Sequence, residues 1–265
     1  MLVAALSLAL VAVPAATAKP AFSAKRADTQ LTILAAASLN VVLPQIDPTQ
    51  KYSFAGSDAL QAQIALGAPA DLFLAASTTG PDALYASGKC QQPVTFITNK
   101  LVLVVPASNP RGISSVYDLE KPGVRVIFGI PTVPIGVYTR QILRNLGLLN
   151  AITPQVVSQE KDVATIAAKL KLGAGDAGFV YQSDAVAAGA LLTTIPVPSW
   201  AQPPVKYEGC VVSSSPNATA AAAYLAKLNT APEQAIFKAD GFLLVKKPAV
   251  IVKHARKQLA KKQKK

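Results

Sequence analysis

The chain has 265 residues, of which 51% are hydrophobic and 15% are charged, so it is long and apolar enough for one large or two medium domains with packed cores. Its formal net charge is +12, but nine basic residues lie in the last twenty, and the remainder carries only about +3. The charge therefore belongs to the basic tail 246–265, which argues against a nucleic-acid-binding face elsewhere. The tail is either a solvated end or a segment that contacts an anionic surface.

The N-terminal residues 2–18 form a predominantly apolar run that contains Pro14 and ends in Ala16-Thr17-Ala18. Small residues at the two alanine positions fit signal-peptidase cleavage, and the run is short for a membrane span. We expect residues 1–18 to be a signal peptide and the chain to be exported, to the periplasm or the extracytoplasmic cell surface. An uncleaved membrane anchor is the alternative.

After residue 30 the sequence alternates between short apolar runs, which favour strands, and helical segments, several of which end at glycine. The predicted strands span residues 31–36, 52–55, 71–75, 101–106, 124–129, 177–181, 192–197 and 210–213. The predicted helices span residues 58–67, 82–87, 137–146, 162–172, 218–228 and 232–238. This alternation indicates an α/β protein with open sheets, which bind ligands at the carboxyl ends of strands. Domain boundaries are expected near residues 96–100 and 203–208, with a second domain inserted into the first.

Several motifs argue against particular classes of site. The glycine pattern at residues 173–178 matches a dinucleotide-binding fingerprint by letters, but a helix precedes it and a strand follows, so we predict a helix end and a turn. The single histidine, His254, lies in the tail, whereas a serine hydrolase needs a histidine base in its core. The pair Cys90 and Cys210 suggests one disulfide in an exported protein, although the sequence does not show that the two residues meet.

Neutral hydrogen-bond donors stand where the predicted elements meet. Ser38 ends the first strand, Ser57 opens a helix, and Tyr181 ends a later strand. The loop 131–136 leads into one helix, and Val163 opens another. Helix N-termini offer free N–H groups and partial positive charge, which suit an anion. These donors either converge on one anion or are unrelated caps and turns, and the pattern alone leaves both interpretations open.

The same residues carry a family resemblance. From residue 31 to residue 245 the chain resembles the molybdate-binding proteins of ATP-driven molybdate importers, within the type II periplasmic binding-protein superfamily. The most specific segments are LTILAAASL, FAGSDALQAQIALGAPADLFLAAS, NKLVLVVP, GIPTVPIGVYTRQIL, EKDVATIAAKL, GDAGFVYQSDAV and QAIFKADGF. The resemblance implies a two-lobed α/β fold in which two open sheets are joined by two crossing strands. Lobe I would comprise residues 31–97 and 209–245, and lobe II residues 98–208.

The resemblance also implies a ligand and a set of binding residues. A molybdate or tungstate ion would lie between the lobes, held by the hydroxyls of Ser38, Ser57 and Tyr181 and by the backbone N–H groups of Ile135 and Val163. Molybdenum would be bound as the oxyanion and not as a bare metal cation. No cofactor and no catalytic residue is implied, so we expect a solute-binding protein and not an enzyme.

The implied partner is the membrane permease of an ABC molybdate importer, and the chain is expected to act as a monomer that binds no nucleic acid. The alternatives are a binding protein for another oxyanion, such as phosphate or sulfate, and a secreted hydrolase, which is less favoured. The chain departs from the family pattern in its short link 40–51, in the bulk of Ile135 and in Asp58. Asp58 is either a first-turn acid favoured by the helix dipole or an inward acceptor that would favour protonated phosphate.

Overall fold

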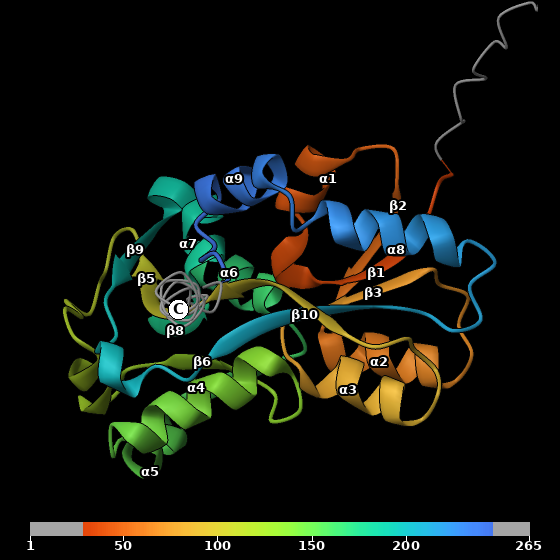
Figure 1. The fold of residues 1–265 in the computed structure, drawn as a ribbon. Coiled ribbons are helices and arrows are strands. Elements are labelled where there is room, and N and C mark those ends of the chain that lie inside the picture. The colour runs from red at the N-terminus through yellow and green to blue at the C-terminus, as the bar shows by residue number, and fades with distance from the viewer. Residues whose placement is uncertain (1–28, 246–265) are drawn as a thin grey trace, which may run out of the picture.

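The chain folds into two five-stranded mixed sheets that lie side by side in an elongated molecule (Figure 1). The computed structural model describes residues 29–245, so the predicted signal peptide and the basic tail lie outside the described residues. The predicted architecture, with two open α/β sheets joined by crossing strands, is confirmed.

The first sheet has the strand order β2-β1-β3-β10-β4. Strand β1 pairs in parallel with β2 and β3, whereas β10 runs antiparallel to β3 and β4. The strands are β1 (Thr32–Ala36), β2 (Lys51–Ala55), β3 (Leu72–Ala75), β4 (Val94–Asn99) and β10 (Val205–Val211).

The second sheet repeats this arrangement with the order β7-β6-β8-β5-β9. Strand β6 is parallel to β7 and β8, and β5 is antiparallel to β8 and β9. The strands are β5 (Leu101–Pro106), β6 (Val126–Gly129), β7 (Val156–Glu160), β8 (Ala177–Tyr181) and β9 (Leu192–Ile195). In such sheets, ligands bind beyond the carboxyl ends of the parallel strands.

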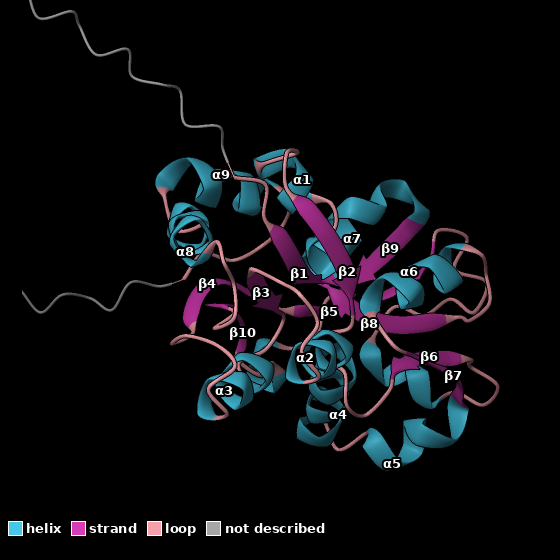
Figure 2. Ribbon diagram, turned by 90° about the vertical axis from the view of Figure 1, so that its right-hand side faces the viewer, coloured by secondary structure: helices cyan, strands magenta, loops and turns pink. Residues whose placement is uncertain are grey.

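Helices cover both faces of the sheets. Figure 1 shows α1, α8 and α9 on one side of the first sheet and α2 and α3 on the other, and Figure 2 shows the same layers from the side. Central strands buried on both faces need apolar residues throughout, and β3 and β5 are buried at every position. The α-helices are α1 (Val42–Ile46), α2 (Ser57–Ala65), α3 (Thr79–Ala86), α4 (Pro134–Asn145), α5 (Leu149–Ile152), α6 (Val163–Lys171), α7 (Gln182–Ala188), α8 (Ala218–Lys227) and α9 (Ala231–Ala239). The 3-10 helices are η1 (Ala37–Leu39), η2 (Val116–Glu120), η3 (Thr153–Gln155), η4 (Gly189–Leu191) and η5 (Ser199–Ala201).

The chain crosses from the first sheet to the second at Lys100, between β4 and β5, and returns before β10. The side chain of Gln202 joins the two crossings, because it accepts a hydrogen bond from the backbone N–H of Leu101 (3.1 Å) and donates one to the Leu101 carbonyl (2.7 Å). The two regions in which domain boundaries were predicted, 96–100 and 203–208, lie largely within the strands β4 and β10. The lobe limits after residues 97 and 208 stay a prediction.

Some predicted element limits are wrong. The strand expected at 210–213 is β10, which starts at Val205, because Pro203 and Pro204 make its first residues resemble a linker. Within it, alternate residues still point inward, with Val205, Tyr207 and Gly209 buried. The strands β4 and β7 and the helices α1, α5 and α7 were not among the predicted elements. The interpretation of the glycines at 173–178 is confirmed, since Gly173 (φ +72°) ends α6 and β8 follows at Ala177.

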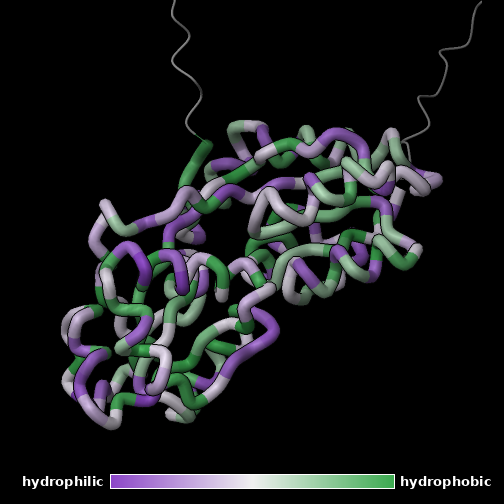
Figure 3. The backbone as a smooth tube through the Cα atoms, turned by 90° about the horizontal axis from the view of Figure 1, so that it is seen from below, coloured by the Kyte–Doolittle hydropathy of each residue, from purple (hydrophilic) through white to green (hydrophobic). Residues whose placement is uncertain are grey.

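Buried hydrophobic side chains pack within and between both halves of the molecule. Figure 3 shows hydrophobic segments at both ends of the elongated chain. Cys90 and Cys210 form a disulfide with Cα atoms 5.8 Å apart, which confirms the suggested pairing. Among residues 29–245, no helix combines the length and the apolar character that a membrane crossing requires.

Candidate functional site

A small cavity between the two sheets brings together all five residues that the sequence singled out. The empty space in it, including the part that is open to solvent, is about 200 Å³. Its first-sheet side comes from the ends of β1, β2 and β3, and its second-sheet side from α4, α6 and β8. The lining residues are Ala36, Ala37, Ser38, Ala55, Gly56, Ser57, Ala76, Val133, Pro134, Ile135, Asp162, Val163 and Tyr181.

On the first-sheet side of the cavity, small residues leave room for a ligand to lie close to the backbone. The strand β1 ends in alanine, and Ser38 lies in the 3-10 helix η1 that follows, so the prediction that Ser38 ends the strand is wrong by one element. Gly56 precedes Ser57, the first residue of α2. The Ser57 Oγ accepts a hydrogen bond from the backbone N–H of Ala76 (3.1 Å). Its own proton is therefore available for another acceptor.

The second-sheet side presents the first turns of two helices. The predicted loop 131–136 is wrong in its second half, because α4 already begins at Pro134. Proline is favoured in the first turn of a helix, since it has no N–H group that would need an acceptor and its φ is already helical. Ile135 is the second residue of α4, and Val163 is the first of α6. The first N–H groups of a helix have no intrahelical acceptor, and these two donate to no other atom within residues 29–245. Both N–H groups can therefore donate a hydrogen bond to a ligand.

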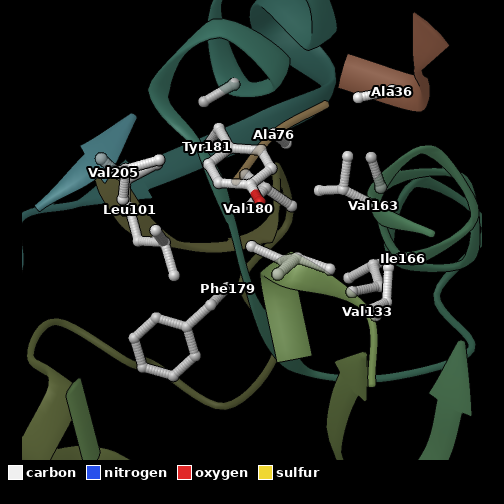
Figure 4. Close-up of a cluster of buried hydrophobic side chains, with 14 of the residues drawn as sticks. Ala36, Ala76, Leu101, Val133, Val163, Ile166, Phe179, Val180, Tyr181 and Val205 are labelled. Carbon is white, nitrogen blue, oxygen red and sulfur yellow. The ribbon is translucent and has the colours of Figure 1, made fainter. Parts of the chain in front are cut away.

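Tyr181 completes the cavity at the end of β8. Its side chain is 1% exposed, and its hydroxyl has no hydrogen-bond partner in the described part of the chain. Figure 4 shows the phenol oxygen on the side of the ring that faces Val163. Burial raises the pKa of Tyr181 well above its ordinary value, so the hydroxyl keeps its proton and can donate.

The charges around the cavity suit an anion that carries no proton. Within residues 29–245, no lysine, arginine or histidine lines it, and no cluster of side chains could hold a metal ion. The one carboxylate in the lining, Asp162, caps its own helix by accepting from the Thr165 backbone N–H (2.7 Å) and hydroxyl (2.9 Å). Positive potential comes instead from the N-termini of α2, α4 and α6.

Asp58 does not line the cavity. One of its carboxylate oxygens accepts a hydrogen bond from the Thr132 hydroxyl (2.6 Å), which links α2 to the segment before α4. The other oxygen is buried and has no hydrogen-bond partner in the part of the chain that the structure describes. Asp58 therefore bridges the two sides of the cavity.

Tyr207 was not predicted from the sequence. It is a fully buried residue of β10, and its hydroxyl lies 2.8 Å from the Ser38 Oγ. Its ring also packs edge-on against Tyr181, with centroids 5.8 Å apart. The alternation of apolar and charged residues from Val205 to Glu208 could have indicated the strand, but the two prolines before it resemble a linker.

Comparison with known proteins shows the family to which the chain belongs. Residues 48–243 match the family model described as bacterial extracellular solute-binding protein. The chain is 33% identical over 222 residues to the molybdate-binding protein ModA of Mycobacterium tuberculosis, with 80% of this chain and 84% of that protein covered. It is 31% identical to ModA of Escherichia coli over 237 residues, covering 81% and 89% of the two chains. The chain belongs to the ModA-type bacterial extracellular solute-binding proteins.

Solved structures show the same fold. The periplasmic molybdate-binding protein of Azotobacter vinelandii superposes with a TM-score of 0.74 at 24% identity, covering 82% of this chain and all of that one. The sulfate-binding protein SubI of Mycobacterium tuberculosis reaches a TM-score of 0.73 at 21% identity, covering 86% and 91%. Membership in the solute-binding family confirms the prediction of a binding protein and not an enzyme, and the secreted hydrolase is not supported.

Proposed function

We propose that this solute-binding protein captures molybdate, and tungstate as well, in the cavity between its two sheets and delivers it to the permease of an ABC importer. The observation that carries the proposal is the buried Tyr181 hydroxyl, which has no hydrogen-bond partner among residues 29–245. The cavity that it faces also offers the hydroxyls of Ser38 and Ser57 and the N–H groups of two helix N-termini. The relatives named ModA support molybdate as the ligand.

The proposed ligand contacts are the hydroxyls of Ser38, Ser57 and Tyr181 and the N–H groups of Ile135 and Val163. A tetrahedral dianion without protons can accept from all of them and needs no acceptor in return. Helix N-termini and local dipoles spread the countercharge, so no cationic side chain is required. Discrimination against sulfate follows from size, because a smaller tetrahedron cannot span both sides with hydrogen bonds of good length.

Phosphate is a poorer candidate for this cavity. It carries a proton near neutral pH and so needs an acceptor, and Asp58, the acid that could have served, lies outside the lining. Asp162 lines the cavity, but its Oδ1 already accepts two hydrogen bonds from Thr165 at the helix cap.

Delivery follows from closure of the two sides on the ligand. An ion bound to donors of one side recruits donors of the other, which shifts the protein toward the closed state that a permease would recognise. The protein would act outside the cytoplasmic membrane as a monomer, after removal of residues 1–18, and without nucleic acid.

Isothermal titration of the chain lacking residues 1–18 tests the proposal. We expect tight binding of molybdate and tungstate, with sulfate and phosphate much weaker. Tight sulfate or phosphate binding without molybdate binding would reject the assignment.

A further inference from the structure

A buried chain of hydrogen bonds runs from the crossing between the sheets to the cavity. The Asn99 side-chain Nδ2, at the end of β4, lies 3.4 Å from the Tyr207 hydroxyl, which lies 2.8 Å from the Ser38 Oγ. The same Nδ2 donates to the hydroxyl of Ser183 in α7 (3.0 Å). All four residues are buried. Of the four, Ser38 lines the cavity.

Asn99, at the end of this series of hydrogen bonds away from the cavity, determines which group donates at each step. The Asn99 Oδ1 accepts a hydrogen bond from the backbone N–H of Lys100 (2.9 Å), which fixes the orientation of the amide. The Nδ2 group can only donate, so the Tyr207 oxygen must accept from it. Burial raises the pKa of Tyr207 well above its ordinary value, so the phenol keeps its proton. That single proton then has one remaining acceptor among the described residues, the Ser38 Oγ.

A hydroxyl that already accepts from Tyr207 cannot also direct its own proton at Tyr207. The proton of Ser38 is left to point into the cavity. Ser57 is prepared in the same way, because its Oγ accepts from the Ala76 N–H. Both serines therefore face the cavity as donors before any ligand arrives.

We infer that Asn99 and Tyr207 are positioning residues that hold Ser38 as a hydrogen donor, and that they thereby select oxyanions without a proton over those that carry one. The inference rests on the proposed function and names a determinant of its specificity. Without the Tyr207 hydroxyl, Ser38 can rotate and accept as well as donate. Molybdate then loses a preorganised donor, whereas hydrogen phosphate gains a possible acceptor.

The test is a double-mutant cycle with Tyr207→Phe and Ser38→Ala, measured by titration with molybdate and with inorganic phosphate at neutral pH. Phenylalanine keeps the ring contact with Tyr181 and removes only the hydroxyl. We expect Tyr207→Phe to weaken molybdate binding about five- to tenfold and to lower the ratio of molybdate to phosphate affinity. In the Ser38→Ala background the same change should have no further effect, because Tyr207 acts through Ser38.

A matched control is Tyr224→Phe, which also removes a hydroxyl bonded to another side chain, Tyr52 (2.9 Å), away from the cavity. It should leave both affinities unchanged. If Tyr207→Phe binds like the unaltered protein, or weakens binding equally with and without Ser38, the inference is overturned. Absence of molybdate binding by the unaltered protein would instead overturn the proposed function, and this inference with it.

Discussion

The hydroxyl of Tyr181 is buried at the end of β8 and satisfied by no other group in the described chain. Leaving such a donor unpaired costs about 1–3 kcal/mol, so the arrangement is unfavourable unless a ligand supplies the acceptor. The two serines differ from it, since each already accepts a hydrogen bond from the protein. The side chains of the site are therefore hydrogen-bond donors, and a bound ligand would supply the acceptors.

Tyr181→Phe should therefore separate binding from stability. We expect molybdate binding to weaken by about 1–3 kcal/mol, while the unliganded protein unfolds at the same urea concentration or a higher one, because the unpaired hydroxyl is gone. Titration and urea unfolding measure the two effects. Tyr85→Phe, at an exposed tyrosine, is the control. Unchanged molybdate affinity in Tyr181→Phe would show that the hydroxyl does not contact the ligand.

A second residue-scale prediction concerns Asp184, which accepts a hydrogen bond from the Tyr181 backbone N–H (3.2 Å). Burial raises its pKa to about 7 and the charge of Asp162 adds to this, while the Tyr181 N–H and Lys171 act in the opposite direction. Between the unfolded pKa, about 4, and the folded value, the native state holds the proton more tightly, so the stability due to this group is lost as pH rises.

Asp184→Asn removes that dependence while keeping an acceptor for the N–H group. The unfolding free energy of the variant, relative to the unaltered protein, should increase from pH 4 to pH 7 and then level off. Denaturant unfolding at several pH values measures this difference. A difference that stays constant over the range would contradict the raised pKa.

Among the elements, those built on strong local patterns could be predicted from the sequence. The apolar runs of β5 and β8 are matched residue for residue, and helix ends at Gly67, Gly88 and Gly147 follow from the left-handed conformation that glycine adopts there. The parts that were missed depend on tertiary context. Strand β7, with its alternating exposed positions, is defined by pairing with β6, and the start of α4 at Pro134 looks like a loop in sequence.

That the predicted residues gather at one cavity could be expected for a similar reason. Ser57, Ile135, Val163 and Tyr181 stand at element ends, where a pattern and a family resemblance both apply. Tyr207 lies within a strand, and its contact with Ser38 joins residues 169 positions apart. No local pattern contains that pairing.

The N-terminus of α6 offers a test at the element scale. Val163→Pro removes the first N–H of the helix, yet proline is favoured at this position, and the preceding Asp162 already has an extended backbone. We expect molybdate binding to weaken by about 1–3 kcal/mol. Val163→Ala keeps the N–H and shortens the side chain, so by titration it should bind more tightly than the proline variant. Equal losses in both variants would assign the effect to packing and not to the N–H group.

At the scale of the whole molecule, function requires the two sides of the cavity to approach each other. Gly56 lies where the two sides are in close contact, since an added Cβ would be 2.3 Å from the Lys161 carbonyl oxygen and 3.2 Å from a Val133 methyl. It would also be 2.9 Å from a carboxylate oxygen of Asp58, which lies on the same side as Gly56. The backbone of Gly56 (φ −59°) is one that alanine adopts readily, so a substitution there acts through contact and not through strain.

Gly56→Ala should keep the protein folded and hinder closure. Because apparent affinity falls with the fraction of competent closed protein, we expect molybdate binding to weaken about tenfold or more. Small-angle scattering should show less compaction on adding molybdate. Gly80→Ala is the control, because its Cβ would meet only the side chains of Phe73 (3.2 Å) and Gln61 (3.3 Å) and no backbone atom. Full compaction and full affinity in Gly56→Ala would mean that closure does not bring these atoms together.

The disulfide acts on the same scale, because 120 positions separate Cys90 and Cys210 and every strand of the second sheet lies between them. Closing so long a loop restricts the unfolded chain. Replacing both cysteines by serine should lower the unfolding free energy by about 2–5 kcal/mol. Neither residue lines the cavity, so molybdate affinity, compared at a temperature where both proteins are folded, should not change. A large loss of affinity without a loss of stability would contradict this account.

The central claim, that neutral donors from both sheets enclose a dianion, is tested most directly by anomalous diffraction from crystals grown with molybdate. The account predicts one molybdenum peak in the cavity, with oxygens in hydrogen-bond range of Ser38, Ser57, Tyr181 and the N–H groups of Ile135 and Val163. A peak held by a lysine or arginine side chain, or one outside an empty cavity, would contradict it.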